Sequence, residues 1–155
     1  MKNLFTAFLS IFIIACSTPE KNANSKIEIY DDSVLDIIDI YSEIEELADS
    51  ISLPEGPVWD EASQSLLFVD VMGNKLYKWN ENDGTSEYIS PSGNTGYAPN
   101  VDFGLLGANG LLIDENGDII LCQHGDRRLA KINNSSTNSP SFTTLVDNYD
   151  GGRFN

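Results

Sequence analysis

From Pro57 onward, the chain is a succession of short runs of β-branched, aromatic and aliphatic residues, each closed by turn-forming residues. Glycine, asparagine and aspartate dominate these breaks, and no long helical period interrupts the series. Such a pattern predicts a fold built of β-strands. The expected strands are residues 57–59, 65–71, 75–79, 85–89, 111–113, 118–122, 128–132 and 142–146.

The eight expected strands fall into two sets of four that look like copies of one unit. Residues 56–61 (GPVWDE) align with residues 110–115 (GLLIDE), a separation of 54 positions. Four strands recurring at this length suggest the blades of a β-propeller, which take about 40–50 residues each. The extra length lies in residues 91–109, a loop rich in glycine, proline and asparagine. Loops of this length are more often functional than idle.

Two blades fall short of a closed propeller, which needs roughly 4–8 blades. We therefore expect an all-β, partial β-propeller, in which residues 51–155 form the N-terminal part of a longer protein. The alternative is a small complete module of two blades, whose sheet edges and packing faces would be left open.

Several short motifs in this region resemble, in the right order, those of the gluconolactonase and senescence-marker-protein (regucalcin-like) family. Residues 53–59 (LPEGPVW) resemble its opening segment, and residues 109–117 resemble a later segment that begins NGL. Residues 122–128 (CQHGDRR) and residues 149–155 (YDGGRFN) resemble two more. The resemblance implies a six-bladed β-propeller with a divalent metal, most often Ca²⁺, in its central channel. It also implies a metal-dependent hydrolase of sugar lactones, although some relatives hydrolyse other esters or organophosphates.

The resemblance assigns Glu55 as the metal ligand, because family members bind the metal through the glutamate of this motif. Ca²⁺ takes 6–8 oxygen ligands, so one carboxylate cannot make a tight site. The other ligands of the family correspond to positions beyond Asn155, and we expect this chain alone to be inactive. Without the resemblance, Glu55 is an exposed carboxylate in a turn.

Four residues are candidates for the substrate pocket. His124 is the only histidine, and it either assists proton transfer in the pocket or hydrogen-bonds across a strand end. Asn109 either points into the channel or sets a turn. Arg153 and Asn155 lie on the approach to the next expected motif. The arginines at 127–128 could position a sugar, but a solvated pair at a strand end is the simpler interpretation.

Three further residues are interpreted as structural. Trp59 and Trp79 are expected in the blade core and not as platforms for sugar stacking. Cys122 follows an apolar run and is expected to be a small buried residue.

The first residues have the features of a bacterial lipoprotein signal. Lys2 precedes an apolar run that is too short for a permanent transmembrane helix of about 20 residues. The run ends in Ile-Ile-Ala before Cys16, which resembles a lipobox and would make Cys16 the lipidated residue. Residues 1–15 are then the signal peptide and residues 16–30 a polar tether. The expected location is the bacterial cell envelope, lipid-anchored in the periplasm or outer membrane. The alternative is an ordinary signal peptide and a secreted protein.

Residues 31–50 are acidic, and their apolar residues fit either helical or strand spacing. We predict a short helix over about 33–40 followed by a strand near 43–48.

The net charge is -15, from 9 lysines and arginines against 24 aspartates and glutamates. Such a surface repels a phosphate backbone, which argues against a nucleic-acid partner. The expected partner is a small sugar lactone, and the sequence leaves the oligomeric state open. The alternative function is a non-enzymatic surface propeller that binds a sugar or protein ligand.

Overall fold

The computed structural model describes residues 27–99, 106–134 and 139–154. The predicted signal peptide, the lipidation site Cys16, most of the tether and the candidate Asn155 lie outside these residues. The chain divides into two compact units between Glu45 and Glu46, and each is described by itself.

The first unit contains a single 3₁₀ helix, η1 (Asp32–Asp36). The Asp31 carboxylate caps it by accepting a hydrogen bond from the Ser33 N–H at 2.9 Å. The predicted short helix is therefore present, but it is a 3₁₀ helix that ends at Asp36 and does not extend to residue 40. Its apolar side chains are largely exposed, and a helix of this length is not stable without tertiary packing. No described helix is long and apolar enough to cross a membrane.

The predicted strand near residues 43–48 is also wrong, because these residues belong to no strand. The sequence there is compatible with an extended conformation. A strand, however, is stable only when a neighbouring strand satisfies its backbone, and residues 43–48 pair with none.

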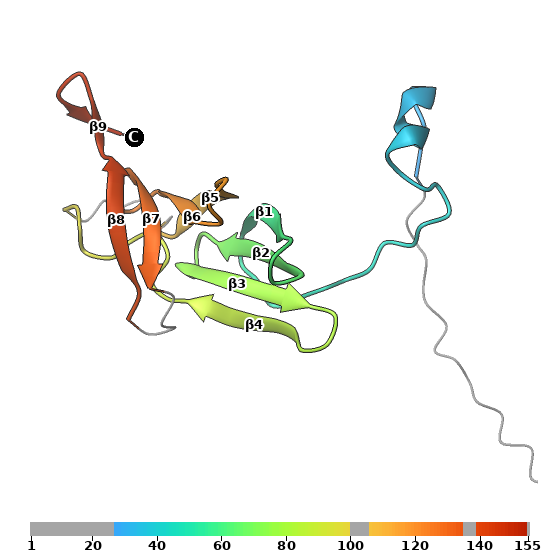
Figure 1. Ribbon diagram of the computed structural model, residues 1–155, viewed down its shortest axis with the longest axis horizontal. Helices are drawn as coiled ribbons and strands as arrows, with labels where there is room; N and C mark the ends of the chain where they lie inside the picture. The colour runs from blue at the N-terminus through green and yellow to red at the C-terminus, as the bar shows by residue number, and fades with distance from the viewer. Residues whose placement is uncertain (1–26, 100–105, 135–138, 155) are drawn as a thin grey trace, which may run out of the picture. The chain divides into compact units, whose positions relative to one another are not determined.

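The second unit holds two four-stranded antiparallel sheets, which confirms the two sets of four strands (Figure 1). In the first sheet the order is β1 (Pro54–Asp60), β2 (Ser65–Asp70), β3 (Lys75–Asn80) and β4 (Gly84–Ile89). In the second sheet it is β5 (Ala108–Ile113), β6 (Ile119–Gln123), β7 (Arg128–Asn134) and β8 (Ser141–Val146). A two-stranded hairpin, β9 (Asn148–Tyr149) and β10 (Gly152–Arg153), follows. Each four-stranded meander is one propeller blade, and we call them the first and the second blade.

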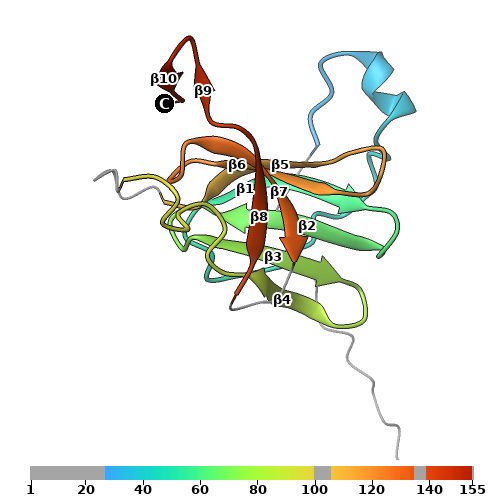
Figure 2. The same ribbon diagram turned by 60° about the vertical axis from the view of Figure 1, so that its left-hand side comes forward.

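The core lies between the two blades, where one face of each is apolar. Leu67, Val69 and Leu76 of the first blade are at most 1% exposed and pack with Leu121 of the second. β5 contacts both β1 and β2. Figure 2 shows β1 and β5, the innermost strands of the two blades, next to each other. The core therefore joins an apolar face of the first blade to an apolar face of the second.

The described part of the long connection, residues 90–99, is tied to the first blade. The Asn74 side-chain oxygen accepts hydrogen bonds from the backbone N–H groups of Ser92, Gly93 and Asn94. Asn74 lies in the turn between β2 and β3, so this turn fixes the path of the connection toward the second blade.

The buried carboxylate of Asp70 ties the start of β1 to the same end of the first blade. Burial, which by itself raises the pKa of Asp70, is outweighed by hydrogen bonds from the backbone N–H groups of Gly73, Leu53, Ser52 and Met72. The pKa therefore lies below its usual value of 3.8.

This carboxylate predicts a loss of stability in acid. Because the pKa of Asp70 is lower in the folded than in the unfolded chain, its contribution is present above about pH 3.8 and is lost as the pH falls through the folded pKa. We expect Asp70→Asn to cost about 1–3 kcal/mol of unfolding free energy at neutral pH. The difference between the two proteins in urea melts should shrink below about pH 4. A difference that does not depend on pH would contradict this assignment.

Candidate functional site

Glu55 and Asn109 occupy equivalent places at the starts of the two innermost strands. Glu55 is the second residue of β1 and Asn109 the second residue of β5. Each strand also has a register irregularity at this place, between Glu55 and Val58 and between Ala108 and Gly110. The 54-residue repeat carries position 55 onto position 109, so this equivalence was present in the sequence.

Both side chains are exposed and available to a ligand. Neither the Glu55 carboxylate nor the Asn109 amide makes a hydrogen bond or ion pair with the described part of the chain. Carboxylate and amide oxygens are the hard donors that Ca²⁺ and Mg²⁺ prefer. Both side chains therefore have the chemistry of a ligand for such a cation.

Direct contact between backbones joins the two positions. Gly56 has a φ of 56°, and a Cβ built on it would lie 2.8 Å from the Cα of Gly110 and 3.1 Å from the carbonyl oxygen of Asn109. Only glycine fits both this conformation and this contact. The residues after Glu55 are thus held against the segment that carries Asn109.

His124 and Asn109 line the same cavity. This cavity has a volume of about 220 Å³ and is lined by Asn109, Cys122, Gln123, His124, Arg128, Leu129 and Phe154. The half-buried His124 enters it from the turn between β6 and β7. Glu55 lines a separate apolar cavity of similar volume with Leu47 and Phe68.

The oxygen atoms of Glu55 and Asn109 suit a divalent cation, but two side chains are few ligands for one. The described part of the chain contains no group of three or more histidine, cysteine, aspartate or glutamate side chains that could hold a metal. Two oxygen-bearing side chains supply a minority of the 6–8 ligands of Ca²⁺.

The expectation of a solvated arginine pair at 127–128 is wrong, because Arg128 is only 6% exposed. Its Nε donates to Gln123 Oε1 at 2.6 Å, and its Nη1 donates to Thr144 Oγ1 at 2.7 Å. Its guanidinium also lies 3.9 Å from the centre of the Tyr97 ring. Burial lowers the pKa of Arg128, although the charge of Asp126 opposes this.

Asp126 anchors the connecting loop to the second blade, a role the sequence analysis missed. Its carboxylate is fully buried and accepts hydrogen bonds from the backbone N–H groups of Thr95 and Tyr97 and from the Thr95 hydroxyl. It also forms an ion pair with Arg128 at 3.5 Å. The residues around Asp126 predict a turn. They do not indicate that Thr95 and Tyr97, about 30 residues earlier in the chain, bind the Asp126 carboxylate.

Arg153 lies on the hairpin strand β10, exposed, with its guanidinium 5.7 Å from the Tyr97 ring centre. The Tyr97 hydroxyl donates to the Asp147 carboxylate at 2.6 Å. Together with a hydrogen bond from Asn148 and the positive charge of Arg153, this bond holds the pKa of Asp147 below its usual value. Arg153 thus lies beside the connecting loop, and the next residue, Phe154, lines the cavity of His124.

Cys122 is exposed, so the expectation of a buried thiol is wrong for this structure. Trp59 was expected in the core, but it is 46% exposed. Trp79, expected there too, is only half-buried. All three lie on sheet faces that no other described sheet covers.

Residues 53–155 match the family model described as SMP-30/Gluconolactonase/LRE-like region. The chain belongs to this family. A gluconolactonase of Zymomonas mobilis is 34% identical over 119 residues, which cover 77% of this chain and 33% of that protein. Regucalcin of Oryctolagus cuniculus is 65% identical over 26 residues, covering 17% of this chain and 9% of regucalcin.

Solved structures show the same fold for members of this family. The X-ray structure of a protein described as a gluconolactonase superposes with a TM-score of 0.61 at 24% identity, over 80% of this chain and 37% of that chain. A gluconolactonase from Xanthomonas campestris gives a TM-score of 0.55 at 23% identity, over 69% and 30% of the two chains. The present chain therefore spans about a third of the length of the gluconolactonases it matches.

Proposed function

We propose that the protein carrying this chain hydrolyses sugar lactones with the help of a divalent metal, most simply Ca²⁺. Membership of the gluconolactonase-like family and the similarity to the Zymomonas enzyme support the reaction class. The single observation that supports the metal is Glu55, an exposed carboxylate at the start of β1 that has no partner among the described residues.

The residues of this chain contribute three elements to such a site. A bound divalent cation would polarise the lactone carbonyl and acidify a water molecule. Glu55 would hold the cation, and Asn109 offers a second oxygen at the equivalent place on β5. His124 lines the same cavity as Asn109 and is the titratable group best placed there to move a proton. Arg153 and Asn155 stay candidates for binding the sugar.

One copy of the chain offers too few metal ligands for catalysis, and we propose that it is inactive by itself. We also propose that Cys16 carries the lipid of an envelope lipoprotein. That proposal rests on the lipobox-like sequence alone.

A second candidate function is a non-enzymatic propeller that binds a sugar or protein ligand. The two functions differ in their need for Ca²⁺. The proposed lactone hydrolysis requires it, whereas a binding scaffold does not.

The test of the metal assignment is a Ca²⁺ titration followed by backbone amide chemical shifts. We expect shifts around Glu55 and weak affinity, on the order of the 10⁻⁴–10⁻³ M typical of loosely liganded sites. Glu55→Gln should weaken binding at least about tenfold. Glu81→Gln, which alters an exposed carboxylate in the turn between β3 and β4, is the control and should bind as the wild type does. Equal binding by both variants, or Ca²⁺-independent lactone hydrolysis by the chain, would contradict the proposal.

A further inference from the structure

Tyr97, in the described part of the connecting loop, contacts three separate parts of the second unit. Its backbone N–H donates to the buried Asp126 carboxylate, in the turn between β6 and β7, at 3.2 Å. The centre of its ring lies 3.9 Å from the guanidinium of Arg128 on β7. Its hydroxyl donates at 2.6 Å to the carboxylate of Asp147, which directly precedes β9. Tyr97 therefore joins the second blade to the hairpin β9–β10.

The hairpin has little structure of its own to fix its position. It forms a sheet of only two strands, and its strand residues are exposed. A two-stranded hairpin by itself is at best marginally stable in water. Its position therefore depends on contacts with other parts of the chain.

Tyr97 makes two contacts with the open end of this hairpin. One is the hydroxyl bond to Asp147, and the other is the Arg153 guanidinium, 5.7 Å from the centre of the same ring. Arg153 pairs with Asn148 across the hairpin, and the Asn148 side chain donates to Asp147 at 2.8 Å. The bond from Tyr97 is the main cause that holds the pKa of Asp147 below its usual value. It therefore acts on an ionised carboxylate, and such bonds are about twice as strong as those between neutral groups.

The hairpin leads directly to the cavity that Asn109 and His124 line. Phe154, the residue after β10, forms part of the wall of this cavity. Arg128, whose guanidinium lies over the Tyr97 ring, lines it as well. Tyr97 thus contacts one residue of the wall and holds the strand that leads to another.

We propose that Tyr97 is a positioning residue of the candidate site. It fixes the hairpin, so that Phe154 stays in the wall of the cavity and Arg153 stays beside the connecting loop. When the hairpin is released, the cavity loses this part of its wall, whereas Asn109 and His124 keep their places on the second blade. Tyr97 therefore acts on the binding of the sugar lactone and not on the chemical step. This consequence rests on the proposed function, but the order of the hairpin does not depend on it.

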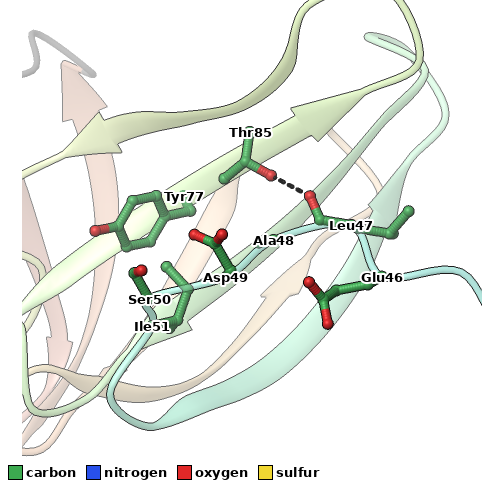
Figure 3. A pocket seen from close by; sticks show the side chains of 8 residues that line it. All are labelled: Glu46, Leu47, Ala48, Asp49, Ser50, Ile51, Tyr77 and Thr85. Atoms are coloured by element: carbon green, nitrogen blue, oxygen red, sulfur yellow. Dashed lines mark hydrogen bonds between the residues drawn. The ribbon is translucent and has the colours of Figure 1, made fainter.

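A second hydroxyl bond in the same unit offers a matched comparison. The Thr85 hydroxyl on β4 donates to the Leu47 carbonyl at 2.8 Å and holds the segment from Glu46 to Ile51 over Tyr77 (Figure 3). Of the described residues that line the cavity of about 500 Å³ there, none is a candidate site residue. Thr85→Val should loosen this segment and leave the hairpin and the His124 cavity unchanged.

The test is the backbone order of the full chain, measured by ¹⁵N relaxation. In the wild type we expect order parameters of about 0.85 for residues 148–153, as in rigid backbone. Tyr97→Ala removes both contacts with the hairpin and should lower these values below about 0.6. Tyr97→Phe keeps the ring and should give intermediate values. Tyr149→Phe removes a hydroxyl from a residue of the same hairpin that is 81% exposed, and with Thr85→Val it should match the wild type.

The His124 ring separates a positioning role from a general loss of stability. His124 is the only histidine, so its imidazole protons give a single set of signals. These signals should move in Tyr97→Ala, because the Phe154 ring leaves the cavity, and they should stay in place in Tyr149→Phe and Thr85→Val. Unchanged amide signals from β2 in every variant show that each one is folded.

Asp147 tests the hydroxyl bond itself. Asp147→Ala should mobilise the hairpin at least as much as Tyr97→Phe does. Because both substitutions remove the same bond, Tyr97→Phe should add nothing further in the Asp147→Ala background. Asp147→Asn keeps an acceptor for the hydroxyl and should retain part of the order.

The kinetic test uses a lactone-hydrolysing protein that carries this chain. Tyr97→Phe should raise KM for the lactone by up to about tenfold, the range expected for one hydrogen bond, with kcat unchanged. A protein without lactone activity would overturn the proposed function, and the order of the hairpin would still decide this inference. An ordered hairpin in Tyr97→Ala, equal mobility in Tyr149→Phe, or a fall in kcat without a change in KM would overturn it.

Discussion

Replacing Asp126 by alanine is expected to lower the unfolding free energy by about 3–5 kcal/mol, because it leaves a buried charge without its partner. The Asp126 carboxylate is fully buried and pairs with Arg128, which is itself only 6% exposed. The substitution also strands the backbone donors of Thr95 and Tyr97. Urea unfolding followed by circular dichroism measures the loss.

Two further variants separate the buried charge from the general effect of losing a carboxylate. Asp83→Ala removes an exposed carboxylate that accepts a hydrogen bond from Asn80, and it should change stability by less than about 0.5 kcal/mol. Arg128→Met in the Asp126→Ala background removes the stranded charge and keeps an apolar side chain of similar length. It should recover part of the loss. If Arg128→Met lowers the unfolding free energy as much in the Asp126→Ala background as it does in the wild type, loss of the ion pair does not explain the effect of Asp126→Ala.

Asp126 also shows where prediction from this sequence reaches its limit. The strands and turns were predicted because alternation and turn residues are local signals, and each hairpin closes within a few residues. The burial of Arg128 depends on Thr95 and Tyr97, which lie about 30 residues away in a loop without a periodic pattern. Nothing in the sequence around Arg128 distinguishes a buried arginine from a solvated one.

The unformed strand near 43–48 fails for a related reason. Its sequence allows an extended chain, but pairing requires a partner that the local sequence does not specify. Cys122 and Trp59 are a different case. Their sequence context indicates burial, and the paired positions in the other blade are indeed packed. For these two residues the prediction of burial is wrong, because no other described sheet covers the faces on which they lie.

For the candidate site, Glu55 and Asn109 were assigned from motifs, and the repeat explains why they share a place on β1 and β5. The repeat alone does not predict the chemical role of these positions, because the carboxylate of Glu55 in the first blade is replaced by the amide of Asn109 in the second. The cavity shared by Asn109 and His124 could not have been predicted from spacing, since these residues come from different strands' ends.

The second large effect is expected for Gly56→Ala, which would drive the two innermost strands apart. A Cβ at position 56 would lie 2.8 Å from the Gly110 Cα, and neither backbone can yield without moving a blade. Overpacking of this kind costs about 1–3 kcal/mol. The positive φ adds roughly 1–2 kcal/mol for a residue with a side chain.

Two glycine variants isolate these causes. Gly117→Ala carries the strain of a φ of 82° but meets no atom within 4 Å, so it should show the conformational part alone. Gly110→Ala places its Cβ 3.8 Å from the Cys122 sulfur, an ordinary contact, and should be close to neutral. We therefore expect the order Gly56→Ala, Gly117→Ala, Gly110→Ala in decreasing loss of unfolding free energy, measured in urea. Equal losses for Gly56→Ala and Gly117→Ala would mean that the blades move apart freely. In that case the backbone contact would not hold Glu55 beside the Asn109 strand, and any ligand site between them would depend on other residues.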